Sequence, residues 1–232
     1  MTPFRPRAVL FDLDGTLVHT APDIAAALNA ALRANGLASI EPARIAELVG
    51  RGAHVLVKRA MAVVGSDDPA LARRVFDDYV GAYAERIGRE GHAFAGAAEC
   101  LRELGARRMK LGVVTNALQR FAEATLAHYG LGKHLSVVVG GDRTAAPKPH
   151  PAALWFACRT MRVAPQEALM VGDSCNDVAA ARAAGCHVVC VPHGYNEGRP
   201  PSELDCEIVP SLSALPGWLD ARTARPRPSN AA

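Results

Sequence analysis

Residues 9–17 read Val-Leu-Phe-Asp-Leu-Asp-Gly-Thr-Leu, and they constrain the fold more than any other stretch of this chain. The apolar run before the first aspartate predicts a short buried strand, and Gly15 predicts a tight turn after it. Side chains alternate along a strand, so Asp12 and Asp14 point to the same side unless the turn has already begun. Two carboxylates held close together repel each other unless a cation or a shared proton lies between them, and Mg²⁺ is suitable because it prefers oxygen ligands. The alternative is an Asp-rich turn whose carboxylates accept backbone N–H groups.

Short apolar runs and helical patterns alternate along most of the chain. Strands are predicted at residues 8–11, 110–115, 136–140, 168–172, 187–191 and 207–209. Helices are predicted at 96–106, 118–129, 151–161 and 176–184, with a short one near 211–220. Continuous apolar strands that alternate with helices favour a parallel sheet covered on both faces, which is a Rossmann-like α/β core. Such sheets bind ligands beyond the carboxyl ends of their strands.

A long helical stretch interrupts this alternation after the first strand. A helix begins at residues 20–23, where Pro22 suits a first turn, and further helices are predicted at about 42–48, 52–64 and 68–87. We therefore expect a core built from residues 1–18 and 91–220 and an all-helical cap at 19–90. The cap leaves the sheet next to Asp14 and can cover that edge as a lid. Residues 221–232 are rich in Pro, Arg and Ala, and we expect them to be disordered.

Composition excludes several classes of function. The net charge of +3 is small and the basic residues are scattered, so nucleic acid is not an expected partner. No apolar run approaches the length of a membrane span, and the N-terminal apolar run is too short and too acidic for a signal peptide. The six cysteines have no zinc-type spacing and are expected to be reduced, which indicates a cytoplasmic protein.

Polar residues follow three of the predicted strands, and a lysine lies in a nearby loop. These are the pair Asp12 and Asp14, then Thr115 with Asn116, Lys148 between two prolines, and the run of residues 172–177 that contains Asp173 and Asp177. Each feature alone has an ordinary structural interpretation. Thr-Asn is typical of a helix N-cap, and a lysine between prolines is typical of a solvated loop. Gly-Asp is typical of a turn, and an acid in the first turn of a helix usually stabilises the helix dipole.

Taken together and in this order, the features resemble the haloacid dehalogenase superfamily of phosphohydrolases over about residues 8–218. Further stretches look like those of the bacterial phosphoglycolate phosphatases within this superfamily: residues 20–23, 49–53, 148–151 and 193–198. The sequence departs from the pattern at His19, where many relatives carry Asp or Ser, and at residues 143–146. Neither change removes a group that the resemblance makes catalytic.

The resemblance implies a metal-assisted phosphoryl transfer. Asp12 would be the nucleophile, and Mg²⁺ would be held by the Asp12 carboxylate, the Asp14 backbone carbonyl and the Asp173 carboxylate. Asp14 would protonate the leaving alkoxide and then activate the water that hydrolyses the aspartyl-phosphate. Asp177 would support the metal from a greater distance, through water or by orienting Lys148.

The resemblance also implies how the substrate is bound. Thr115 and Asn116 would hold the phosphoryl oxygens by hydrogen bonds, and Lys148 would place a fixed ammonium beside them. Arg51 in the cap would bind a substrate carboxylate, because glycines on either side allow a close approach. Four residues near these motifs are assigned either a contact in the site or a role in packing: His150, Cys175, His193 and Tyr195.

The sequence therefore predicts a Mg²⁺-dependent phosphatase for a small phosphorylated metabolite, with 2-phosphoglycolate as the expected substrate. A phosphatase for a sugar phosphate or a phosphorylated amino sugar is the first alternative, since the same catalytic residues would serve it. A phosphosugar mutase and a non-enzymatic binding protein are the others. A dehalogenase is disfavoured because Asp14 would have no alkoxide to protonate.

Overall fold

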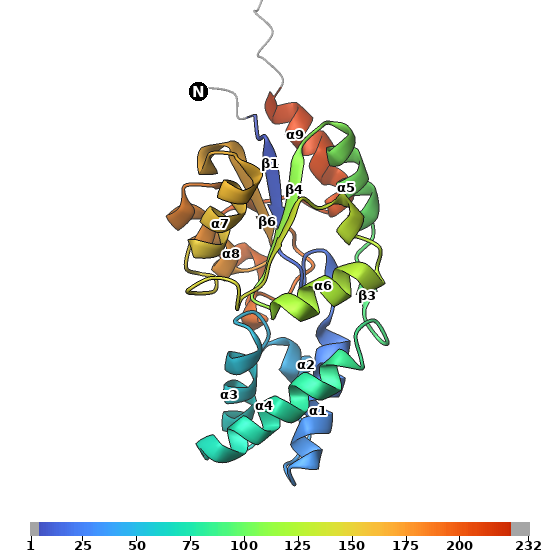
Figure 1. The fold of residues 1–232 in the computed structure, drawn as a ribbon, viewed down its shortest axis with the longest axis vertical. Coiled ribbons are helices and arrows are strands. Elements are labelled where there is room, and N and C mark those ends of the chain that lie inside the picture. Colours follow the sequence, from blue (N-terminus) through green and yellow to red (C-terminus); the bar gives the residue numbers. More distant parts are fainter. Residues whose placement is uncertain (1–4, 224–232) are drawn as a thin grey trace, which may run out of the picture.

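A parallel sheet of six strands forms the centre of the computed structural model, which describes residues 5–223 (Figure 1). The order across the sheet is β5 (Val137–Val139), β4 (Lys110–Val114), β1 (Ala8–Phe11), β6 (Ala168–Gly172), β7 (His187–Cys190) and β8 (Glu207–Ile208). Every neighbouring pair is parallel. The predicted Rossmann-like α/β class is confirmed, and the predicted strands agree with the observed ones to within one residue at each end.

The register of the sheet aligns the carboxyl ends of its three central strands. Phe11, the last residue of β1, lies opposite Val113 of β4 and Val171 of β6. The residues that follow these strands therefore emerge at one edge of the sheet. This is the edge at which parallel sheets bind their ligands.

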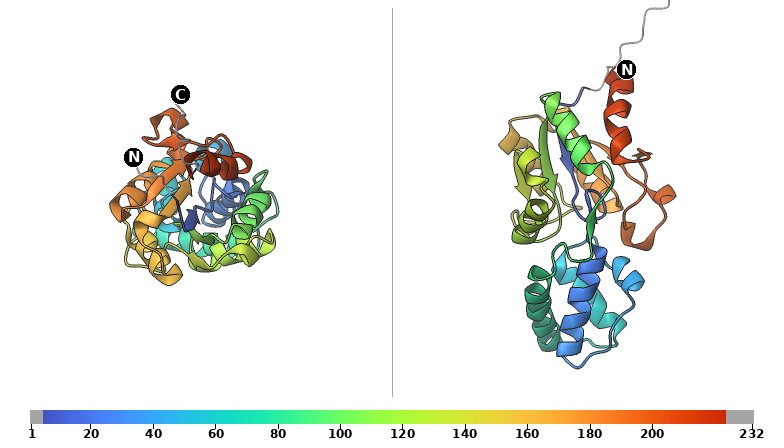
Figure 2. Two further views of the ribbon diagram at one scale, coloured as in Figure 1. Left: turned by 90° about the horizontal axis from the view of Figure 1, so that it is seen from above. Right: turned by 90° about the vertical axis from the view of Figure 1, so that its right-hand side faces the viewer.

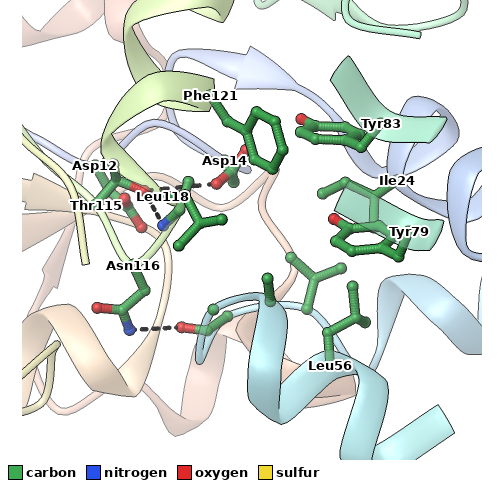
Figure 3. A pocket seen from close by; sticks show the side chains of 15 residues that line it. Asp12, Asp14, Ile24, Leu56, Tyr79, Tyr83, Thr115, Asn116, Leu118 and Phe121 are labelled. Atoms are coloured by element: carbon green, nitrogen blue, oxygen red, sulfur yellow. Dashed lines mark hydrogen bonds between the residues drawn. The ribbon is translucent and has the colours of Figure 1, made fainter. Parts of the chain in front are cut away.

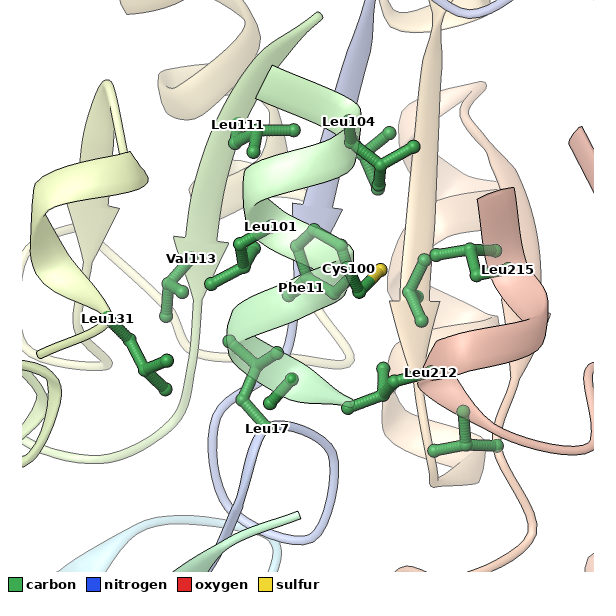
Figure 4. Close-up of a cluster of buried hydrophobic side chains, with 14 of the residues drawn as sticks. Phe11, Leu17, Cys100, Leu101, Leu104, Leu111, Val113, Leu131, Leu212 and Leu215 are labelled. Carbon is green, nitrogen blue, oxygen red and sulfur yellow. The ribbon is translucent and has the colours of Figure 1, made fainter. Parts of the chain in front are cut away.

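Helices cover both faces of the sheet (Figures 1 and 2). One face packs against α5 (Ala97–Ala106), α6 (Gln119–His128) and α9 (Leu215–Thr223), and the other against α7 (Ala152–Met161) and α8 (Cys175–Ala184). Alternation along β1 explains this division, since Val9 and Phe11 belong to the first cluster and Ala8 and Leu10 to the second. Figure 4 shows the first cluster, where leucines of α5 lie over β1 and β4. Short 3₁₀ turns complete the connections: η1 (Gly132–His134), η2 (Pro165–Glu167), η3 (Asn196–Gly198), η4 (Pro201–Glu203) and η5 (Leu212–Ala214).

The inserted stretch forms a separate group of helices at the carboxyl edge of the sheet (Figure 1). It contains α1 (Ala21–Ala34), α2 (Pro42–Ala46), α3 (Ala53–Val63) and α4 (Pro69–Ala84). These helices bury their own apolar stripes against one another, and the core contributes Phe121 of α6 to the same cluster. Because a single apolar cluster joins α4 to α6, the space between the two groups of helices is closed on that side. The division into a core at 1–18 and 91–220 and a cap at 19–90 remains our proposal.

Both connections between the two groups run through one short antiparallel pair, β2 (Val18–His19) and β3 (His92–Ala93). The Asp23 carboxylate fixes the returning chain by accepting hydrogen bonds from the N–H groups of Gly88 and Glu90, at 2.9 and 2.8 Å. The sequence analysis did not predict this pair, because two-residue strands have no detectable periodicity.

The last helix ends later than predicted, at Thr223. The expected disorder of residues 221–232 is wrong for 221–223, which belong to α9, and the other predicted residues lie outside the described part of the chain. Arg222 stabilises this last turn, because its guanidinium lies 4.6 Å from the Trp218 ring centroid and forms an ion pair with Glu207. Among residues 5–223, no helix combines the length and apolar character that crossing a bilayer requires.

Candidate active site

One lysine connects the carboxylates at the carboxyl edge of the sheet. Lys148 Nζ lies 2.9 Å from Asp12 Oδ1 and 2.6 Å from Asp177 Oδ1, and it donates to the Val114 carbonyl at 2.8 Å. The Lys148 side chain is 2% exposed. Burial acts to lower its pKa, but Asp12 and Asp177 raise the pKa well above the ordinary value of lysine, so the ammonium stays charged. Of the two routes expected for Asp177, the structure contains the direct contact with Lys148.

Three carboxylates gather around this ammonium. One oxygen from each of Asp12, Asp173 and Asp177 lies within 4.8 Å of the others. Burial, followed by repulsion from Asp177, raises the pKa of Asp173 to about 7. Burial also raises the pKa of Asp12 well above its ordinary value, against the attraction of Lys148. One ammonium does not balance this buried negative charge, so the donor set fits a hard divalent cation such as Mg²⁺.

Glycines make room for Asp173. Its Oδ1 accepts a hydrogen bond from Thr16 at 2.7 Å, and its Oδ2 accepts one from the Tyr195 N–H at 2.8 Å. A Cβ at Gly194 would lie 2.1 Å from the Asp173 side chain, and a Cβ at Gly15, whose φ is +86°, would lie 2.6 Å from it. The two glycines therefore allow both backbones to approach the carboxylate that the family resemblance assigns to the metal.

Asp14 faces the space between the sheet and the helical group. Its carboxylate accepts a hydrogen bond from Thr20 at 2.6 Å and a long one from Thr115 at 3.5 Å. Burial raises the pKa of Asp14, although both hydroxyls act to lower it. A carboxyl group with a raised pKa, next to an open pocket, is suited to exchange protons with a bound molecule.

Asn116 connects the lysine loop to the helical group. Its side chain donates to the carbonyls of Lys148 and Gly50 at 2.8 and 2.9 Å, and its Oδ1 accepts the Lys148 N–H at 2.7 Å. The predicted contact of Asn116 with substrate stays a prediction, whereas these bonds give it a visible part in positioning Lys148. Thr115 Oγ1 accepts the Ala117 N–H at 3.1 Å, which is the local cap that its alternative interpretation describes.

A pocket lies between the aspartates and the helical group (Figure 3). It encloses about 510 Å³ of space free of protein atoms, including its open mouth. Asp12, Asp14 and Thr115 line one end of it. The other walls are mostly apolar and come from α1, α3, α4, α6 and the loops before α3 and α6. A small molecule in this pocket would therefore touch the carboxylates and the helical group at once.

Arg51 is paired with an acid that the sequence analysis did not single out. Its Nε donates to Glu197 Oε1 at 2.7 Å, and Arg59 of α3 donates to Glu197 Oε2 at 2.7 Å. Burial acts to raise the pKa of Glu197, but hydrogen bonds from Asn176 and the two arginines lower the pKa to about 2. Gly50 and Gly52 line the pocket, whereas Arg51 does not. No sequence signal pairs residues this far apart, and the substrate contact of Arg51 stays a prediction.

The remaining residues of the predicted motifs make packing contacts. Tyr195 Oη accepts the Ala21 N–H at 2.9 Å and lies 3.0 Å from His19 Nδ1, at the connection between the two groups of helices. His193 Nε2 lies 3.2 Å from the Thr16 carbonyl. His150 Nδ1 accepts the N–H of the residue two positions later, and Cys175 donates its N–H to Asn196.

The family to which the chain belongs is evident from its sequence. The profile of the haloacid dehalogenase-like hydrolases matches residues 9–191, which is most of the chain. The chain therefore belongs to this family, as the resemblance predicted.

Relatives within this family identify the class of enzyme. The chain is 42% identical to a phosphoglycolate phosphatase of Nitrosospira multiformis, over 90% of this chain and 94% of the relative. It is 39% identical to one of Thiobacillus denitrificans, over 91% and 94%. Among solved structures, a predicted phosphoglycolate phosphatase from Haemophilus somnus matches with a TM-score of 0.88 and 30% identity, over 94% of this chain and 99% of that one. The expected enzyme class, a phosphoric monoester hydrolase, is confirmed.

Proposed function

We propose that the protein hydrolyses 2-phosphoglycolate to glycolate and inorganic phosphate, with Mg²⁺ bound at the carboxylate cluster. The observation that carries this proposal is the buried group of Asp12, Asp173, Asp177 and Lys148 next to a small pocket that Asp12 lines. The substrate is proposed because the relatives at about 40% identity bear the name phosphoglycolate phosphatase. The protein would then act on a small phosphorylated metabolite. Its free cysteines support a cytoplasmic location.

The metal would be held by the Asp12 and Asp173 carboxylates and the Asp14 backbone carbonyl. When bound, a divalent cation neutralises charge between the phosphoryl oxygens and the attacking carboxylate. Lys148 adds a fixed positive charge at 2.9 Å from Asp12, and Asp177 holds its ammonium in place.

In the first step an oxygen of Asp12 attacks phosphorus, and the bond from phosphorus to the glycolate oxygen breaks. Asp14 gives its proton to the departing alkoxide, for which its raised pKa is suited. In the second step a water attacks the aspartyl-phosphate while Asp14 takes up a proton from it. Phosphate leaves and the Asp12 carboxylate is restored. Thr115 and Lys148 bind the phosphoryl oxygens in both steps.

The test is phosphate release from a panel of phosphate esters, with Mg²⁺ present or chelated. The panel contains 2-phosphoglycolate, sugar phosphates and an amino-sugar phosphate, compared by kcat/KM. A value for 2-phosphoglycolate at least about tenfold above the others, or about 1.4 kcal/mol of discrimination, supports the proposal. A preference for a sugar phosphate refutes 2-phosphoglycolate as the substrate but leaves the proposed mechanism of hydrolysis in place. Activity that needs a bisphosphate activator would indicate a mutase.

Asp12→Asn tests the mechanism itself, because an amide cannot attack phosphorus as a carboxylate does. We expect kcat to fall by at least about a thousandfold, in the range found when a covalent nucleophile is removed. A variant with full activity would refute the aspartyl-phosphate pathway and favour a different nucleophile.

A further inference from the structure

Two tyrosines of α4 form part of the pocket wall on the side of the helical group (Figure 3). Tyr79 and Tyr83 are 3% and 4% exposed, and their rings are stacked with centroids 5.7 Å apart. Tyr83 packs edge-on against Phe121, and its hydroxyl has a hydrogen bond with Thr125. Figure 3 shows the hydroxyl ends of both rings on the side of the pocket that faces Phe121 and Asp14.

The Tyr79 hydroxyl has no hydrogen-bond partner among residues 5–223. Within the same residues, Tyr129 Oη is the side-chain polar atom that has neither a partner nor contact with solvent. Because Tyr79 Oη also lacks a partner but is not sealed from solvent, and because Tyr79 lines the pocket, its hydroxyl opens onto the pocket. A buried hydroxyl normally has a partner, because leaving it unpaired costs roughly 1–3 kcal/mol. Burial and the nearby Asp14 raise the pKa of Tyr79, so the hydroxyl keeps its proton as a donor.

A bound molecule cannot form an ion pair with a basic side chain at the end of the pocket away from Asp12 and Asp14. Asp12 and Asp14 line the pocket, but no lysine or arginine side chain is among its lining residues in the described chain. Arg51, the nearest candidate from the sequence, has its guanidinium engaged by Glu197. An anionic group at this end must therefore be bound by neutral donors.

The first turn of α3 offers such donors beside Tyr79. Gly52 and Ala53 line the pocket, and no side chain caps this end of the helix. The first hydrogen bond within the turn runs from the Leu56 N–H to the Gly52 carbonyl, so the preceding N–H groups of α3 have no partner in the helix. The N-terminal end of a helix also carries a partial positive charge.

We propose that the Tyr79 hydroxyl, together with the first turn of α3, binds the carboxylate of the leaving group and so determines specificity for a short acid phosphate. This inference rests on the proposed function and adds a residue to it. Because Tyr79 would donate to a charged group, its hydrogen bond is of the stronger, charge-assisted kind. Arg51 would then serve the contact with Glu197 and leave the substrate to Tyr79.

The other walls of the pocket fit the same class of substrate. Most are apolar side chains with no hydrogen-bonding group: Ile24, Val49, Leu56, Leu118 and Phe121. The Asn116 amide also lines the pocket, but it is already bonded to Gly50 and Lys148. The hydroxyls of a sugar phosphate would lose water against these walls without gaining partners, which is unfavourable. A two-carbon acid has a single methylene for the apolar walls and one carboxylate for Tyr79.

The experiment compares two substrates of similar size, 2-phosphoglycolate and ethyl phosphate, of which only the first has a carboxylate. For Tyr79→Phe we expect kcat/KM for 2-phosphoglycolate to fall about tenfold or more, mainly through KM, the loss expected for a hydrogen bond to a charged group. The value for ethyl phosphate should change less than about threefold. Since the ring is retained and the removed hydroxyl is unpaired, the variant should keep the melting temperature of the wild type.

Tyr83→Phe and Arg51→Met are the matched controls, and each should leave the ratio of the two substrates within about threefold of the wild type. An equal effect of Tyr79→Phe on both substrates, or none, overturns the inference while the function stands. A selective loss in Arg51→Met overturns it in favour of the arginine. A wild-type enzyme that does not prefer 2-phosphoglycolate to ethyl phosphate refutes the proposed function, and the carboxylate site with it.

Discussion

Replacing Lys148 with methionine removes the one ammonium held among the buried carboxylates. Methionine is close to lysine in length and fills the same space, so the change removes charge with little loss of volume. The ammonium of the wild type lies 2.9 Å from Asp12 and 2.6 Å from Asp177, and the thioether of methionine can form neither ion pair. The variant therefore leaves two buried carboxylates without their cation.

The size of the effect follows from these distances. At an effective dielectric constant of about 20, each pair contributes about 6 kcal/mol of Coulomb attraction. The cost of taking the three charged groups out of water offsets most of this gain. Breaking a buried ion pair from one side typically costs about 3–5 kcal/mol, and we expect the free energy of unfolding to fall by that amount.

The assay is urea unfolding at pH 8 with chelator present, followed by circular dichroism. Lys133→Met is the control, because that lysine is exposed and its replacement should change stability by less than about 0.5 kcal/mol. Saturating Mg²⁺ should narrow the difference in unfolding free energy between Lys148→Met and the wild type, since the metal ion then balances the carboxylates. A decrease below about 1 kcal/mol in the chelated protein would refute the view that Lys148 offsets buried charge.

Three further predictions concern neighbouring groups. Because Asp173 has a pKa of about 7, the metal-free native protein keeps a proton that the unfolded chain releases above about pH 4. Relative to Asp173→Asn, which lacks this carboxyl group, the wild type should thus lose stability from pH 4.5 to 7.5 in urea titrations; a gain contradicts this. Gly194→Ala should lower kcat/KM by about 10- to 100-fold by displacing Asp173, whereas Gly217→Ala, whose Cβ meets nothing within 4 Å, should have no effect. Glu197→Gln should raise KM about two- to fivefold and leave kcat unchanged. The ion pairs of Glu197 with Arg51 and Arg59 hold the start of α3, which lines the pocket, and partly exposed ion pairs contribute roughly 1 kcal/mol. Initial rates test this against the exposed Glu203→Gln, and equal KM values for the two variants would argue against the contact.

The core of the fold could be predicted because its signals are local. Buried strands such as β1 and β6 are continuous apolar runs, and a polar residue directly after a run identifies the end of a strand. Parallel strands bring these ends to one edge, so Asp12, Thr115 and Asp173 could be grouped without coordinates.

Features that depend on contacts between distant residues could not be predicted. Glu197 meets Arg51 and Arg59 across more than 130 positions, and nothing near Glu197 in the sequence indicates a basic partner. In the sequence, Tyr79 is one more member of an apolar stripe on α4, and nothing shows that its hydroxyl lacks a partner. Its importance follows from the partners it lacks, which only the packing of α1, α3 and α6 around it reveals.

The β2–β3 pair makes the helical group an exchangeable module. Val18 faces Ala93 and His19 faces His92, so the chain leaves and returns at points within about 5 Å of each other. A two-residue turn could close that gap, and the strand ends that carry Asp12 and Asp173 belong to the part that would remain. Evolution or an engineer can therefore graft a different set of helices between His19 and His92 and give the same chemistry a new choice of substrate.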